Sequence, residues 1–430
     1  MFNTGKFVAL VMILYFVLRT HGIVQVLPGF WVIPFAFIIL YSFHSILKSN
    51  LKSTQFLIKQ SKWIIVSVLI LIVYKYFKYG NFKLHSTFDY LLTSIPFYIV
   101  GYYNGVKLNK LIIKNLSIFY FVFLFIFLLP KIFLVITTGA IFNNLFVDDI
   151  NDKGFLLFLP FVSFATIFGF LQIIKSKFYL IRVLGTIMLI FNLLALFLSG
   201  KAGPIVVILF ALIFYFLKKD KLVLRRYRNV IFSTLGVFLF LFLVSSGLFG
   251  DLGSLQRKSS AFINIVDSDF LLNDQVLNQL TSDRWTLSSY SVEQFFKKPL
   301  FGHGAYLESV GEMLGESQEL TTAAGGHSFI FDTLAFFGIL GLPLIMILYK
   351  FMKDGIKYYE LVKNNQEERK VSLIYASLLV GIFIANFLNS GFLFSSFDNY
   401  LFLLSGFYLG KFYRIKKQLF NKNSLRIRPF

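Results

Sequence analysis

Apolar stretches of about 20 residues recur from one end of this chain to the other, and each is long enough to cross the ~30 Å hydrocarbon core of a bilayer as a helix. The chain has 430 residues with a mean hydropathy of +0.72, and 57 of its residues are Phe. A soluble protein of this length needs far less apolar surface to fill its core. The sequence therefore predicts an all-α, polytopic integral membrane protein.

About twelve spans are expected. The first apolar stretch lacks the small-residue cleavage site of a signal peptide, and another span follows it closely, so it is interpreted as a retained anchor. The spans lie near residues 6–20, 28–47, 62–79, 88–105, 111–137, 154–174, 180–198, 202–217, 229–249, 327–349, 371–390 and 395–412.

Basic residues indicate the orientation of these spans, because Lys and Arg near span ends accumulate on the cytoplasmic side. With the N-terminus inside, the cytoplasmic segments hold 30 of the 42 Lys and Arg residues. Both termini are therefore predicted to be cytoplasmic. This topology also accounts for the formal net charge of +21, because the basic clusters lie along one membrane face, so nucleic acid is not an expected partner.

One connection differs from the others in length. Residues 250–326 form a predicted extracytoplasmic loop with ten acidic and five basic residues, in a chain that is otherwise basic. Long loops in compact proteins usually have a function. The loop divides the chain into an N-terminal bundle of about nine spans (1–249) and a C-terminal region (327–430) of about three spans with a basic tail.

Within the loop, SDRWTLSSYSVEQFFKKP predicts an amphipathic helix that begins after Ser282 or Asp283 and ends at Pro299. This helix is expected to lie along the outer surface, and PLFGHG (299–304) is expected to form a turn that includes His303. The residues that share one face of the helix are Trp285, Ser289, Val292 and Phe296.

Three polar residues on the predicted outer side are candidates for catalysis or binding. His327, at the start of the tenth span, could act as a general base for a hydroxyl, or could simply be satisfied by backbone or water. Arg284 could bind phosphate oxygens or be an ordinary interfacial Arg. Lys201, in the short turn LSGKAGP, could reach an anionic ligand or extend to lipid headgroups.

Other polar groups carry less information. Asp267 and Asp269 could hold a divalent metal, but a solvated turn in an acidic loop explains them as well, and no metal or cofactor is assigned. His303 lies between two glycines and is interpreted as a turn residue. The sequence lacks a phosphate-binding glycine loop, a zinc-protease motif and a serine nucleophile elbow.

The order of these features resembles the O-antigen polymerase and ligase superfamily, which includes Wzy-type capsular polysaccharide polymerases. The resemblance rests on LSGKAGP, on DRW followed by PLFGHG in the large loop, and on HSFIFDTLAFFGILG at the following span. Arg284 and His327 match the family pattern. Lys201 departs from it, because the family usually has Arg in this turn, and Ser328 departs because Asn often follows the histidine.

The resemblance implies glycosyl transfer at the outer face of the cytoplasmic membrane, from an undecaprenyl-diphosphate-linked oligosaccharide to the hydroxyl of a growing polysaccharide chain. Arg284 and Lys201 would stabilise the charge that develops on the diphosphate without a metal, and His327 would accept the hydroxyl proton. The lipid bilayer, a flippase and a chain-length regulator are the further partners that this activity implies.

Other functions fit part of the pattern. A polysaccharide ligase would differ mainly in its acceptor. A polysaccharide flippase or transporter would more typically have two related halves than one dominant loop. A membrane-bound acyltransferase would also use a histidine but would not need the external Arg284 and Lys201.

Overall fold

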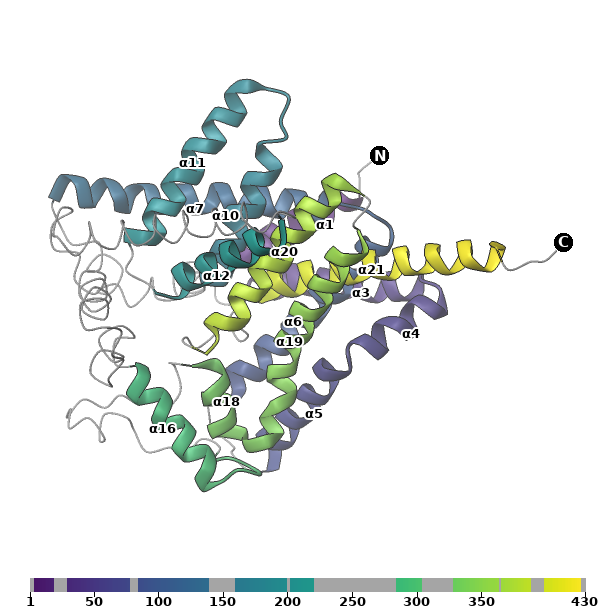
Figure 1. Cartoon of the computed structure of the whole chain (residues 1–430), viewed down its shortest axis with the longest axis vertical. Coiled ribbons are helices and arrows are strands. Elements are labelled where there is room, and N and C mark those ends of the chain that lie inside the picture. Colours follow the sequence, from purple (N-terminus) through teal and green to yellow (C-terminus); the bar gives the residue numbers. More distant parts are fainter. Residues whose placement is uncertain are drawn as a thin grey trace.

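The structure is a computed structural model that describes residues 4–18, 29–77, 84–138, 159–198, 202–219, 284–303, 328–362, 365–387 and 398–426. Within these ranges the regular elements are all helical, which confirms the predicted all-α class (Figure 1). They are α1 (Thr4–Leu18), α3 (Val32–Leu47), α4 (Leu51–Gln60), α5 (Lys62–Phe77), α6 (Leu84–Val106), α7 (Leu111–Thr138), α10 (Leu159–Ile173), α11 (Tyr179–Leu198), α12 (Ala202–Lys219), α16 (Arg284–Lys297), α18 (Phe329–Phe337), the 3-10 turn η1 (Gly338–Gly341), α19 (Leu342–Leu361), α20 (Gln366–Ala385) and α21 (Asp398–Arg426).

Each expected span contains helix, except that the span at 229–249 lies outside the described residues, and α4 and α16 lie outside the expected spans. In the described part of the chain, one helical stretch, Phe329–Leu361, which consists of α18, η1 and α19, is long and apolar enough to cross a membrane. Helices α4 and α5 pass the same test together but are bent by 58° at their junction. The number of twelve spans therefore stays a prediction.

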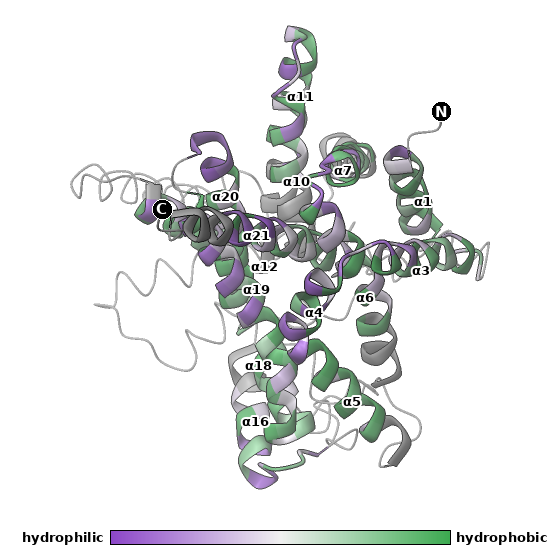
Figure 2. Ribbon diagram, turned by 90° about the vertical axis from the view of Figure 1, so that its right-hand side faces the viewer, coloured by the Kyte–Doolittle hydropathy of each residue, from purple (hydrophilic) through white to green (hydrophobic). Residues whose placement is uncertain are grey.

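The outer sides of several helices are apolar. Leu40 on α3, Leu69 on α5 and Leu184 on α11 are each half or more exposed, and further large apolar side chains are exposed along the same helices. Figure 2 shows α5 as an almost continuous hydrophobic ribbon. Soluble monomers rarely expose apolar surface on this scale, whereas lipid tails cover it at no cost.

Helices α6 and α21 form the most extensive helix pair, although they lie about 300 residues apart in sequence. Two Gly-x-x-x-Gly pairs bring their backbones into contact, a spacing typical of close helix packing in membranes. A Cβ atom added at any of the four glycines would lie 2.0–2.1 Å from a carbonyl oxygen of the other helix. The glycines are Gly101 and Gly105 on α6 and Gly406 and Gly410 on α21.

Helix α12 packs against α20, and the two helices run in opposite directions. Val207 near the start of α12 contacts Gly381 near the end of α20, where an added Cβ would lie 2.2 Å from the Val207 carbonyl oxygen. At the other end, Tyr359 of α19 donates to the Lys218 carbonyl and accepts from Arg369. The beginning of α12 therefore lies level with the end of α20.

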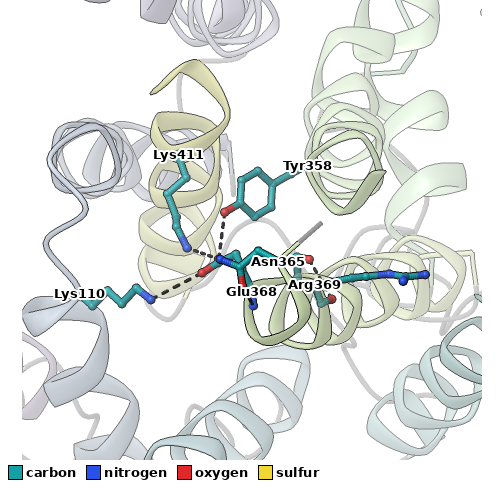
Figure 3. Close-up of polar contacts among 7 residues, drawn as sticks. Lys110, Tyr358, Asn365, Glu368, Arg369 and Lys411 are labelled. Atoms are coloured by element: carbon teal, nitrogen blue, oxygen red, sulfur yellow. Dashed lines mark hydrogen bonds and ion pairs between the residues drawn. The ribbon is translucent and has the colours of Figure 1, made fainter. Parts of the chain in front are cut away.

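A buried ionic cluster joins four segments at one end of the bundle (Figure 3). Glu368 on α20 pairs with Lys411 of α21, accepts a hydrogen bond of 2.9 Å from Tyr358 of α19, and lies 3.6 Å from the Lys110 ammonium that precedes α7. Burial alone would raise the pKa of Glu368, but the Lys411 ammonium, the Tyr358 hydrogen bond and Lys110 together outweigh it and hold that pKa below its usual range. The cluster, called here the Glu368 cluster, fixes α21 to α20.

Candidate active site

Helices α16 and α18 pack side by side and run in the same direction (Figure 1). Ser291, in the middle of α16, bonds Asp332 in the first half of α18. Beyond the end of α16, His303 donates from its backbone to the Ala335 carbonyl, further along α18. The N-terminal ends of the two helices therefore lie at the same end of the pair. Arg284 is the first residue of α16.

Asp332 lies at the centre of the contact between these helices. Its side chain is 6% exposed, and its two oxygens accept hydrogen bonds from different elements. Oδ1 accepts from the Ser291 hydroxyl at 2.8 Å, and Oδ2 accepts from the Ser328 backbone N–H at 3.1 Å. A buried acid in an apolar helix needs such partners, because an unpaired one would be strongly destabilising.

Ser328 caps the N-terminus of α18 and also binds α20. Its hydroxyl accepts from the Phe331 N–H and donates to the Asn386 carbonyl, both at 3.3 Å. The Ile330 N–H donates to the same carbonyl at 3.4 Å. Since Asn386 directly follows α20, the start of α18 is fixed at the C-terminal end of α20.

The start of α12 lies at this same end. Val207 contacts Gly381, and each lies five residues, or ~7.5 Å along its helix, from Ala202 and Asn386 respectively. Because α12 and α20 are antiparallel, Ala202 comes level with Asn386. The first residues of α12 and α18 thus lie level with the C-terminal end of α20, and the first residue of α16 lies on the same side of the α16–α18 contact; this region is called here the Ser328 end.

Two of the predicted site residues, His327 and Lys201, lie outside the described residues, as do Asp267 and Asp269. Their chain neighbours are described. Ser328 follows His327 directly, and Ala202 follows Lys201 directly, so both neighbours are at the Ser328 end. For Arg284 the structure describes its position at the start of α16, which is also at the Ser328 end.

The turn after α16 is fixed tightly against the end of α18. The Pro299 carbonyl accepts from the Ile339 N–H at 2.7 Å, and the Phe301 carbonyl accepts from the Tyr74 hydroxyl of α5 at 2.5 Å. Gly302 and Gly338 both have positive φ angles and approach so closely that a Cβ on either would overlap backbone atoms. Only glycine fits this contact without strain.

His303 belongs to this turn, as the sequence predicted. Its ring Nε2 lies 2.9 Å from the Gln294 carbonyl, which can only accept, so Nε2 carries the proton. Desolvation lowers the pKa of His303, and the nearby Lys298 and Lys297 lower it further, against the opposing effect of the Gln294 bond. The imidazole is therefore neutral at pH 7 and caps the end of α16.

The face of α16 that packs against α18 is polar. Ser291 and Gln294 are buried against α18, whereas Ser289 is exposed and Phe296 is 72% exposed. Of the four residues predicted to share one face of this helix, Ser289 and Phe296 therefore do not contribute to the contact with α18. The physical reason is that α16 turns its polar side to Asp332, so its apolar residues face outwards, as suits a helix at a membrane interface.

Sequence patterns did not identify Ser291 and Asp332. The available signal was the acid itself, since Asp332 is the one charged residue in the apolar segment 329–349 and ionisable groups in such segments are usually functional or paired. In the described part of the chain, no three His, Cys, Asp or Glu side chains form a group that could hold a metal ion.

Comparison with known families gives one match. Residues 187–346 match the family model described as O-antigen ligase. The matched range contains Lys201, Arg284, Ser291, His327 and Asp332. No curated protein matches the sequence.

Proposed function

We propose that this chain is an integral membrane protein of the O-antigen polymerase and ligase superfamily and acts as a polysaccharide polymerase, and the match of residues 187–346 to the family model supports this proposal. In this proposal it joins undecaprenyl-diphosphate-linked repeat units into a surface polysaccharide at the outer face of the cytoplasmic membrane. The observation that carries the proposal is that three helices, α12, α16 and α18, all begin at the Ser328 end.

Each helix start brings one predicted site residue. Arg284 begins α16, Lys201 immediately precedes α12, and His327 immediately precedes the cap of α18. The N-terminal end of a helix carries a partial positive charge and unpaired backbone N–H groups. Three such ends with two cations form a suitable environment for a diphosphate.

The reaction follows from these charges. The bond between the anomeric carbon of the donor glycan and the diphosphate oxygen breaks, and the acceptor hydroxyl oxygen bonds to that carbon from the opposite side, which inverts the anomeric centre. Arg284 and Lys201 stabilise the negative charge on the departing diphosphate. His327 takes the proton of the acceptor hydroxyl.

An apolar surface and a polar region suit the two chemical parts of the substrate. The exposed Phe296, Leu300 and Phe301 lie at the end of α16 opposite to Arg284 and in the turn that follows it, where they can contact a lipid tail or the membrane interface. The sugars would occupy the polar side, under the loop of residues 250–326. A flippase that delivers the donor and a chain-length regulator are the partners that this activity requires.

A ligase is the second candidate, because the matching family model carries that description. It would use the same donor and the same residues, and would differ in transferring the glycan to an acceptor other than another repeat unit. The polymerase and the ligase thus differ only in the acceptor of the glycan.

The test is reconstitution of the full chain in liposomes with a lipid-linked repeat unit as the sole glycan. A polymerase produces a ladder of lipid-linked chains that grow by whole repeat units. A ligase leaves single units unchanged until a different acceptor is supplied. If well-folded protein forms neither product, that result would contradict glycosyl transfer from this donor.

A further inference from the structure

We infer that Asp332 is a positioning residue that holds the Arg284 helix and the His327 segment in register with each other. This inference rests on the proposed function, since it assigns those two segments to one site. It adds Asp332 and its partner Ser291 to the residues that the reaction requires.

The bonds of Asp332 reach both segments. Oδ1 accepts from Ser291, which is on the same helix as Arg284, and Oδ2 accepts from the backbone N–H of Ser328, which is the residue bonded to His327. Ser291 is 1% exposed and Ser328 is fully buried. One carboxyl group is thus the shared partner of a helix inside the long loop and of the helix that follows the loop.

Helix capping alone would not require this arrangement. An acid in the first turn of a helix is favoured by the helix dipole, and its bond to the Ser328 N–H satisfies one unpaired donor of α18. The second bond leaves α18 and reaches a serine of another helix. That bond fixes α16 and has no capping role.

The bond of Ser291 can control the position of Arg284, because both residues are on α16. Seven residues separate them, which is ~10 Å along the helix axis. The other anchor of α16, the turn at Pro299–His303, lies at the far end. If the Ser291 bond is lost, α16 can pivot on that turn, and a tilt of a few degrees moves Arg284 by about 1 Å, a displacement that can cost ~10²-fold in rate.

The experiment compares Asp332→Ala with Asp332→Asn in the full chain, reconstituted with the lipid-linked donor. Asn can preserve both bonds, because its oxygen can accept from the Ser328 N–H while its NH₂ donates to the Ser291 hydroxyl. The Ala variant is expected to lose ~10²-fold in kcat with a smaller change in KM for the donor, and the Asn variant to keep most of the rate. Glu293→Gln, an exposed acid-to-amide change on α16, is the matched control and should have no effect.

A second readout follows the position of α16 without using activity. The chain contains no cysteine, so a single Gln294→Cys reporter, buried between α16 and α18, can be probed with a membrane-impermeant maleimide. Labelling is expected to be slow in the otherwise native protein and with Asp332→Asn, and at least several-fold faster with Asp332→Ala. Ser291→Ala, which removes one bond, is expected to be labelled at an intermediate rate. It replaces Asp332→Ala in the test if that variant does not accumulate in the membrane.

Full activity in Asp332→Ala or in Ser291→Ala, or unchanged labelling in both, would overturn the inference. Loss of activity in Asp332→Asn with labelling still slow would also overturn it, because the charge and not the two bonds would then matter. If the native protein forms no product from the donor, the proposed function fails and the catalytic part of the inference with it, whereas the labelling still shows whether Asp332 holds α16.

Discussion

Ser328 shows how a departure from a family pattern can preserve its chemistry. In the superfamily that the sequence resembles, Asn often follows the histidine. Ser and Asn are both strong helix N-caps, because each side chain can accept from a backbone N–H of the first turn. Here the Ser328 hydroxyl accepts from the Phe331 N–H and also donates to Asn386. The cap therefore survives the change, and it sets the direction in which the chain leaves His327.

Arg284 is expected to be essential for its geometry as well as its charge. Arg284→Ala should abolish polymer formation at normal protein level, and Arg284→Lys should restore only part of it, because an ammonium group cannot bind two phosphate oxygens as a planar guanidinium does. Gel analysis of polymer, normalised to membrane protein, measures both variants. Wild-type polymer from Arg284→Ala would remove Arg284 from the site.

At the scale of helices, hydrophobic length was a good guide to where helices lie, and a poor guide to which faces pack. The helix expected between Ser282 and Pro299 is observed as Arg284–Lys297. Its buried side could not be predicted from apolar periodicity, because the partner surface is the polar group Asp332. Helix α4 was not expected either, since its sequence LKSTQFLIKQ is too polar and too short for a span.

The pairing of α6 with α21 depended on information that no single helix carries. The Gly-x-x-x-Gly spacing marks each helix as a candidate for close packing, but which two helices pair is decided by tertiary contacts. The order of the helix starts at the Ser328 end is likewise a tertiary property, because residues 202, 284 and 328 are far apart in the chain.

Gly406→Ala is expected to destabilise the protein, although Ala normally favours a helix over Gly by ~1 kcal/mol. The new Cβ would lie 2.1 Å from the Tyr98 carbonyl oxygen, so α21 would have to move off α6. Gly185→Ala on α11 is the matched control, because its added Cβ meets only the Ile173 side chain. Thermal unfolding in detergent should show a lower midpoint for Gly406→Ala alone. Equal midpoints would contradict the close contact.

At the scale of the described molecule, the Glu368 cluster and the Ser328 end lie at opposite ends of α20. The Glu368 cluster joins segments 106–110, 350–370 and the C-terminal helix, all three of which the charge distribution assigns to the cytoplasmic side. The Ser328 end joins segments assigned to the outer side. The segments predicted to be cytoplasmic thus lie together, apart from the segments predicted to be external. The orientation itself stays a prediction.

The Glu368 cluster should be a stability determinant. Glu368→Gln removes the negative charge that balances the Lys411 ammonium, which is 5% exposed and lies over three aromatic rings, and removal of one partner of a buried pair costs ~3–5 kcal/mol. The double variant Glu368→Met with Lys411→Met should be much closer to wild type, since no buried charge remains. Unfolding midpoints of the single and double variants test this, and a double variant as unstable as Glu368→Gln would contradict it.

The same pair predicts a dependence of stability on pH. Because the pKa of Glu368 is lowered in the folded protein, its contribution is fully present above the unfolded value and is lost as the pH falls through the folded value. Stability should therefore decline in acid, and Glu368→Gln should flatten that decline. If stability declines equally with falling pH in both proteins, other carboxylates are responsible for the decline.

Topology reporters test the orientation. A reporter fused after Lys219 or at the C-terminus should be cytoplasmic, and one inserted near Gly311 should be external, because of the distribution of basic residues. An external reporter at the C-terminus would contradict the arrangement of twelve spans.

The central claim, that the helix starts at the Ser328 end form a glycosyl-transfer site with His327 as its base, is tested most directly by His327→Gln. Glutamine keeps hydrogen-bonding ability and much of the size of histidine but cannot take the acceptor proton. The measurement is polymer length together with membrane protein level in the same cells. The account predicts normal protein level, a loss of transfer on the order of 10²–10⁴-fold, and accumulation of donor as single lipid-linked repeat units. Near-normal polymer at normal protein level would show that His327 is not the base.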